Sequence, residues 1–144
     1  MADRLYHVPG LGHFSALLLA AEIADIHRFP SFKKFCSYSG LAPSTHQSGS
    51  KIYHGRIIKD SNPYIRCVLI EAVNHAIKKD HSLYWFYQRI AKKHGTNKAR
   101  VATAHKLAKI IYFMLLKNQD YYLNKTIVHS RVSPYTKLGT AQHL

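Results

Sequence analysis

The chain has 144 residues, 47% of them apolar, which is enough for one domain with a buried core. Its 21 Lys and Arg residues outnumber its 7 Asp and Glu residues, and a formal charge of +14 favours a polyanionic partner. Cys36 and Cys67 provide no disulfide framework, and the eleven histidines show neither an HExxH pattern nor a paired CxxC. The apolar run 17–21 is too short to cross a bilayer. We therefore expect a cytoplasmic protein without membrane insertion or bound metal.

The first local signal is Val8-Pro9-Gly10-Leu11-Gly12, a tight turn that leads into an apolar helix of about a dozen residues. Gly10 and Gly12 would let backbone N–H groups approach a phosphate at a helix N-terminus, as in a helix-hairpin-helix motif. An ordinary Pro-Gly turn before a core helix is the alternative.

Helix signals then recur along the chain, and they predict a mainly α fold. Residues 25–29 break the apolar helix that follows Gly12. Pro30 then begins another helix, which Gly40 ends. Asn62 and Pro63 begin a core helix that runs to about Lys79. The next predicted helix starts at Asp80 or Ser82 and ends at Gly95. The last predicted helix runs from about Asn97 to Lys117. We assign residues 1–118 to the helical domain and 119–144 to a tail that is at most partly ordered.

The stretch 38–66 is the longest without helical periodicity, and it holds the candidate chemistry. β-branched and aromatic residues around Gly55 allow a short β-hairpin there. Ser48 precedes Gly49, so a hydroxyl lies on a flexible loop. A serine can attack a phosphodiester if its proton is removed and the developing charge is stabilised. From spacing alone, a serine next to a glycine in a loop is more often an ordinary turn residue than a nucleophile.

Cations follow this serine closely, and they are candidates for phosphate binding: Lys51, Arg56, Lys59 and Arg66. Lys and Arg exceed Asp and Glu by one in residues 1–50, by eight in 51–100 and by five thereafter. A solvated basic face is the alternative. Tyr53, Tyr64, Tyr84, Trp85 and Tyr87 could stack on bases, although we expect most of them to pack.

These segments together resemble the C-terminal domain of the insertion-sequence transposases of the IS-one-hundred-and-ten family, the DEDD transposases related to the Piv DNA invertase. The resemblance runs through residues 5–117 in order. The matching segments are VPGLG at 8–12, LLLAAEIADIHRFPSF at 17–32, YSGLAPSTHQSG at 38–49, IIKDSNPYIR at 57–66 and RVATAHKLAKIIYFML at 100–115. The chain departs from the family pattern at Ser61, Pro63 and Ile65.

The resemblance implies a DNA recombinase module in which Ser48 attacks a DNA phosphate and forms a covalent phosphoserine link. It also implies a preceding RuvC-like domain whose four carboxylates bind Mg²⁺, a partner RNA encoded by the element, and assembly as a dimer or higher homo-oligomer. No cofactor is expected within this chain. We expect the isolated chain to bind DNA without completing recombination.

Two other functions remain open at this stage. One is a non-catalytic nucleic-acid-binding accessory domain in which Ser48 is only a turn residue. The other is a cationic domain that docks on an acidic protein, which weak, salt-insensitive binding to DNA and RNA would favour.

Overall fold

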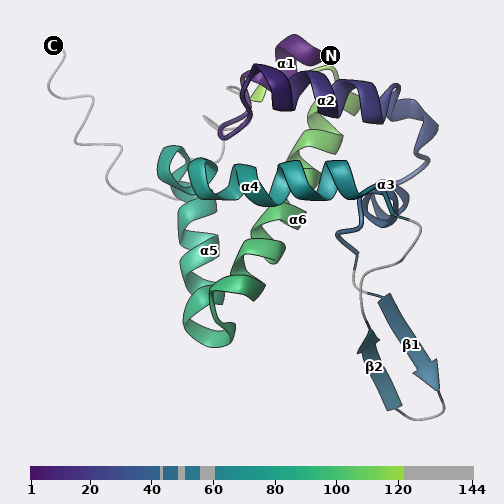
Figure 1. Cartoon of the computed structure of the whole chain (residues 1–144), viewed down its shortest axis with the longest axis vertical. Helices are drawn as coiled ribbons and strands as arrows, with labels where there is room; N and C mark the ends of the chain where they lie inside the picture. The colour runs from purple at the N-terminus through teal and green to yellow at the C-terminus, as the bar shows by residue number, and fades with distance from the viewer. Residues whose placement is uncertain (43, 49–50, 56–60, 122–144) are drawn as a thin grey trace, which may run out of the picture.

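The computed structural model describes residues 1–42, 44–48, 51–55 and 61–121, which form helices and one small sheet (Figure 1). The mainly α fold class is confirmed, including a short hairpin followed by three helices. The elements are α1 (Ala2–Tyr6), α2 (His13–Ile23), the 3-10 turn η1 (Ile26–Arg28), α3 (Phe32–Tyr38), β1 (Ser44–Ser48), β2 (Lys51–Gly55), α4 (Pro63–Lys79), α5 (His81–His94) and α6 (Thr96–Leu116).

The three long helices begin and end where the capping residues predict. Asn62 Oδ1 accepts hydrogen bonds from the backbone N–H groups of Tyr64 (2.9 Å) and Ile65 (3.2 Å), and Pro63 is the first residue of α4. Asp80 caps α5 in the same way, and Gly95 separates α5 from α6 with a backbone φ of +90°. Local sequence chemistry therefore sets the lengths of these helices.

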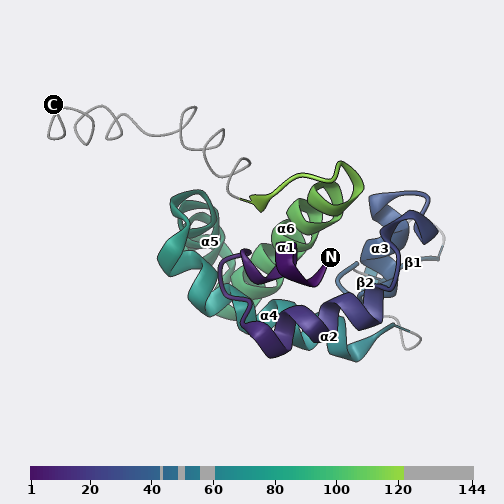
Figure 2. The ribbon, with the colours of Figure 1, turned by 90° about the horizontal axis from the view of Figure 1, so that it is seen from above.

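The core lies around α6, against which α4 and α5 pack, while α2 covers α4 and α3 contacts α6 (Figures 1 and 2). One apolar face of α4 is buried in this core: Ile65, Leu69, Ala72, Val73 and Ala76. An aromatic cluster joins η1 and α3 to α6, since Phe35 stacks on Tyr112 at 5.7 Å and the Tyr112 hydroxyl donates to the Phe29 carbonyl. This packing holds α2, α3 and α4 in one body.

Several sequence expectations differ from the structure. The helix α1 was not predicted, and it holds its place by burying Leu5 against its neighbours. The helix after residue 30 starts at Phe32 with Ser31 as its cap, rather than at Pro30. Cys36 lies in the core, where burial raises the pKa of its thiol to about 11, but Cys67 is exposed on α4.

The end of the described chain extends past the predicted helical domain. Tyr121 is buried, and its hydroxyl donates to the Asp80 carboxylate. Residues 122–144 lie outside the described residues, so the domain boundary at 118 stays a prediction. In the described part of the chain, no helix is both long and apolar enough to cross a bilayer.

Candidate nucleic-acid interface

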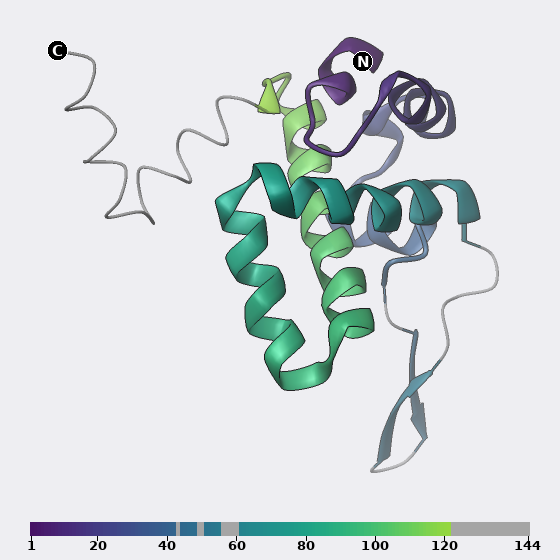
Figure 3. The ribbon, with the colours of Figure 1, turned by 60° about the vertical axis from the view of Figure 1, so that its left-hand side comes forward.

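The strands β1 and β2 pair in antiparallel register, with Ser48 opposite Lys51 and Ser44 opposite Gly55. Two residues connect them, and Gly49 is the residue type that two-residue hairpins favour at the first connecting position. The hairpin therefore turns between Ser48 and Lys51, not around Gly55 as predicted. Ser48 and Lys51 end their strands at the tip, which projects away from the helices (Figures 1 and 3).

Among the other predicted phosphate ligands, the structure describes Arg66, which does not lie at this tip. Arg66 lies half-buried in α4, whose first residues are at the open end of the hairpin. Five-residue strands span about 15 Å, so the tip lies about that far from the open end of the hairpin. Arg56 and Lys59 lie outside the described residues.

A polar cluster ties together the two ends of the segment that carries the hairpin. The Asn62 backbone N–H donates to the Tyr38 carbonyl at 2.7 Å, and the Asn62 side-chain amide donates to the Tyr38 hydroxyl at 3.3 Å and to the Glu22 carboxylate. These contacts close the chain between 38 and 62 into a loop. The hairpin thus projects from a root that α2, α3 and α4 fix.

Arg28 completes this root from η1. Its guanidinium lies 4.7 Å from the ring centroids of Phe29 and Tyr38, and it donates to the Glu22 backbone carbonyl at 2.9 Å. The hydrogen bond from Asn62, followed by that from Arg28, lowers the pKa of the Tyr38 hydroxyl. A capping Asn and a Tyr were visible in the sequence, but nothing in the spacing indicated that Glu22 and Arg28 would meet them.

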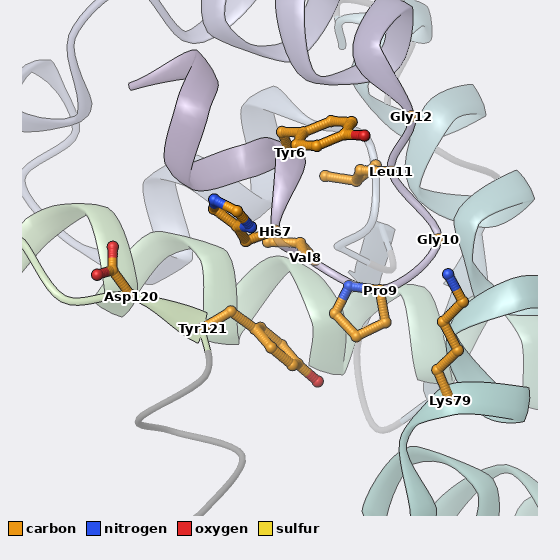
Figure 4. Close-up of a pocket in the computed structure, with 10 residues that line it drawn as sticks. All are labelled: Tyr6, His7, Val8, Pro9, Gly10, Leu11, Gly12, Lys79, Asp120 and Tyr121. Atoms are coloured by element: carbon orange, nitrogen blue, oxygen red, sulfur yellow. The ribbon is translucent and has the colours of Figure 1, made fainter.

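The turn at residues 8–12 lies between α1 and α2 and borders a cavity of about 770 Å³ (Figure 4). The side chain of Lys79 lies beside the turn at Gly10, while Asp120 and Tyr121 line the cavity further along. Gly10 has φ +90°, and a Cβ there would lie 2.2 Å from the Ala72 carbonyl oxygen. Gly12 is exposed, precedes α2, and has no atom near the position of a Cβ. The helix-hairpin-helix assignment stays a prediction.

Charge on the described surface is concentrated on α5 and α6. Residues 81–116 carry seven Lys and Arg residues and no Asp or Glu. Exposed aromatic side chains accompany them, with Trp85 61% exposed and Tyr84 38% exposed. The expectation that most of the interleaved aromatics pack is wrong for these two and for Tyr64, which is 59% exposed.

The sequence matches the model of the transposase IS116/IS110/IS902 family over residues 2–88, which is more than half of the chain. The chain belongs to this transposase family. The match includes α1, the turn at Gly10, the β-hairpin and the whole of α4. It ends within α5, so the family model leaves most of the basic α5 and α6 pair outside its range.

Relatives of this family member include transposases and pilin gene-inverting proteins. It is 32% identical over 124 residues to the transposase for insertion sequence element IS1111A of Coxiella burnetii. The aligned residues cover 83% of this chain and 34% of that protein. It is 30% identical to a probable family 20 transposase of Pseudomonas aeruginosa, over 83% of this chain and 36% of the relative. It is 32% identical to the pilin gene-inverting protein of Moraxella bovis, over 83% of this chain and 38% of that protein.

The chain thus spans about a third of the length of the curated relatives that it matches. No solved structure matches it. Among the described residues, no three His, Cys, Asp or Glu side chains are grouped so that they could hold a metal ion. The described part of this family member therefore has no such cluster for Mg²⁺.

Proposed function

We propose that this chain is the DNA-binding and strand-exchange module of a transposase or site-specific recombinase, with Ser48 as its nucleophile. Membership of the transposase family and the likeness to a gene-inverting protein support the general reaction. The observation that carries the role of Ser48 is its register at the tip of the hairpin, directly opposite Lys51. A nucleophile at this position would act away from the helical core, where an extended substrate such as DNA could reach it.

The reaction would proceed by phosphoryl transfer. The Ser48 Oγ attacks a DNA phosphorus, so that an Oγ–P bond forms while one P–O bond to the sugar breaks, and the sugar oxygen leaves as a hydroxyl after taking up a proton. The serine proton passes to a base or to solvent. Attack by a sugar hydroxyl of the partner strand then reverses these bonds and releases Ser48. Lys51 stabilises the charge on the phosphoryl oxygens, and Arg56, Lys59 and Arg66 bind flanking phosphates.

The remaining partners are proposed on the family resemblance. A RuvC-like domain outside this chain would supply carboxylates for Mg²⁺, and an element-encoded RNA would select the DNA. Gly10 and Gly12 would let the backbone at the start of α2 approach a phosphate. Two or more copies would assemble on the DNA to exchange strands.

A non-catalytic accessory domain is the second candidate. It is favoured by the seven cations of residues 81–116, which suit binding to a nucleic acid without any role for Ser48. The two functions differ in one product, because only the nucleophile leaves a covalent protein–DNA adduct.

The test is adduct formation on a suicide DNA substrate with Mg²⁺ present, using the chain joined to the remaining length of a family transposase. Ser48→Ala should reduce the adduct at least about a thousandfold, since a removed nucleophile has no substitute. Ser50→Ala is the matched control, because it removes a hydroxyl two residues away, and it should keep the adduct. An adduct that survives Ser48→Ala would overturn the assignment. Tight DNA binding by the wild type without any adduct would favour the accessory domain.

A further inference from the structure

The exposed face of α5 combines aromatic and cationic side chains that have no part in the proposed role of Ser48. Trp85 is 61% exposed near the start of the helix, and it meets Tyr84 edge-to-face with ring centroids 5.7 Å apart. Arg89 follows one turn after Trp85, on the same side of the helix, and Lys92 and Lys93 continue the exposed cations to its end. An indole left this exposed loses the burial that normally stabilises a tryptophan.

The charge around this face is of one sign. Residues 81–116 contribute seven positive charges to the chain's formal +14 and no negative ones. The adjacent acid, Asp80, is buried, and its carboxylate accepts hydrogen bonds from the N–H groups of Ser82 and Leu83 and from the Tyr121 hydroxyl. Two ion pairs of the described ranges, Arg4 with Asp120 and Asp25 with His27, lie outside α5 and α6.

Two of these cations are held close together without an acid between them. Lys106 Nζ lies 4.4 Å from the centroid of the Phe86 ring, and the Arg89 guanidinium lies 5.5 Å from the same centroid. Burial, together with repulsion from Arg89, lowers the pKa of Lys106, and Asp80 only partly opposes this. A bound phosphate would relieve the repulsion, so the arrangement suits an anionic ligand.

We infer that the exposed face of α5 binds an unpaired nucleic-acid strand, with a base stacked on Trp85 and phosphates bound by Arg89, Lys92 and Lys93. Every base has a π-face, so an aromatic side chain beside cations binds single strands with little sequence preference. Paired bases present no free face to an indole, which is why the aromatic residue favours an unpaired strand over a duplex. The inference shares with the proposed function only the nature of the partner and does not depend on Ser48.

Trp85 is the only tryptophan of the chain, so its fluorescence reports on this surface directly. We would titrate the full chain with a 15-nucleotide oligothymidylate and, separately, with a duplex of equal length. The single strand should quench the fluorescence, and Trp85→Leu should weaken its binding by about 5- to 100-fold. Trp85→Phe should keep most of the affinity, because phenylalanine retains a stacking face. A parallel titration with oligouridylate distinguishes an RNA strand from a DNA strand.

Phe14→Leu is the matched control, since Phe14 is the most exposed large apolar side chain on α2, at 78%, and lies outside this surface. It should leave both affinities within about twofold of the wild type. Binding of the single strand without quenching would overturn the inference while leaving the proposed DNA-binding function in place. The inference also fails if Trp85→Leu weakens duplex and single-strand binding equally, or if Phe14→Leu has the same effect as Trp85→Leu.

Discussion

Gly10 has a packing role that the sequence did not indicate. Its φ of +90° is a conformation that other L-residues rarely adopt, and its Cα faces the backbone of α4 so closely that a Cβ would lie 2.2 Å from the Ala72 carbonyl oxygen. The Pro-Gly signal predicted the tight turn correctly. The contact with α4 was not predictable, because it depends on two segments about sixty residues apart in the sequence.

Three glycine-to-alanine variants separate conformational strain from steric overlap. Gly10→Ala should lower the free energy of unfolding by about 2–5 kcal/mol, because it combines a positive φ with a clash against backbone. Gly95→Ala carries the same φ with no atom within 4 Å, so about 1–2 kcal/mol is expected. Gly12→Ala has neither problem and should cost less than about 1 kcal/mol. Urea unfolding measures all three, and equal losses for Gly10→Ala and Gly95→Ala would refute the role of the Ala72 contact.

At the scale of elements, the sequence predicted those whose ends carry local chemistry. Asn62 with Pro63, Asp80 and Gly95 are capping or terminating residues, and α4, α5 and α6 follow them closely. The helix α1 has five residues, too few to be stable without tertiary contacts, and its burial of Leu5 could not be read from local propensity. The hairpin was displaced in the prediction because apolar residues 57 and 58 drew it toward Gly55, whereas β1 is polar throughout.

The candidate site was predictable only in part for a similar reason. Ser48 and Lys51 are three residues apart, so local sequence was enough to name both, but their pairing across the hairpin was not predicted because the turn was expected at Gly55. The root of the hairpin joins Glu22, Arg28, Tyr38 and Asn62 from separate elements, and no spacing rule predicts such contacts. Most of the five aromatics near the basic residues were expected to pack because aromatic residues usually are buried, and only the packed helices show that Trp85 stays exposed on α5.

The junction of α5 with the end of α6 depends on Asp80, and its removal should destabilise the fold. One carboxylate oxygen accepts from the N–H groups of Ser82 (2.9 Å) and Leu83 (3.4 Å), and the other accepts from the Tyr121 hydroxyl. Asp80→Ala removes the cap and leaves a buried hydroxyl unsatisfied, so a loss of about 2–4 kcal/mol is expected in urea unfolding. Asp25→Ala, which removes the exposed cap of η1, is the control and should cost less than about 1 kcal/mol.

Tyr121 also makes the stability of the folded chain depend on pH. Burial, reinforced by the hydrogen bond to Asp80, raises the pKa of Tyr121, so the folded state disfavours the phenolate. The resulting stabilisation is complete below the ordinary tyrosine pKa of about 10 and is lost as the pH rises above it. Tyr121→Phe should therefore flatten the alkaline decline in stability, and Asp80→Ala with Tyr121→Phe should cost less than the sum of the two. Strict additivity, or an unchanged alkaline profile in Tyr121→Phe, would contradict this coupling.

At the scale of the whole molecule, the fold directs two projections to the same side of α4. The β1–β2 hairpin and the far end of the α5 and α6 pair both extend away from α1 and α2 (Figures 1 and 3). One projection carries Ser48 and the other carries half of the net charge. This arrangement would let a single extended nucleic acid contact both the proposed nucleophile and the basic helices, with α4 as the support between them.

The position of the charge, rather than its total, should decide binding to nucleic acid. Lys92→Gln with Lys93→Gln removes two exposed charges from α5, while Lys33→Gln with Lys34→Gln removes two exposed charges from α3. Affinity for a DNA oligonucleotide should fall steeply with salt in the wild type, because each phosphate contact releases counterions. The α5 pair should reduce the slope of log K against log salt by about 1–2, and the α3 pair should leave it nearly unchanged. Equal changes in both double variants would mean that binding follows net charge alone, and weak, salt-insensitive binding in the wild type would favour docking on an acidic protein.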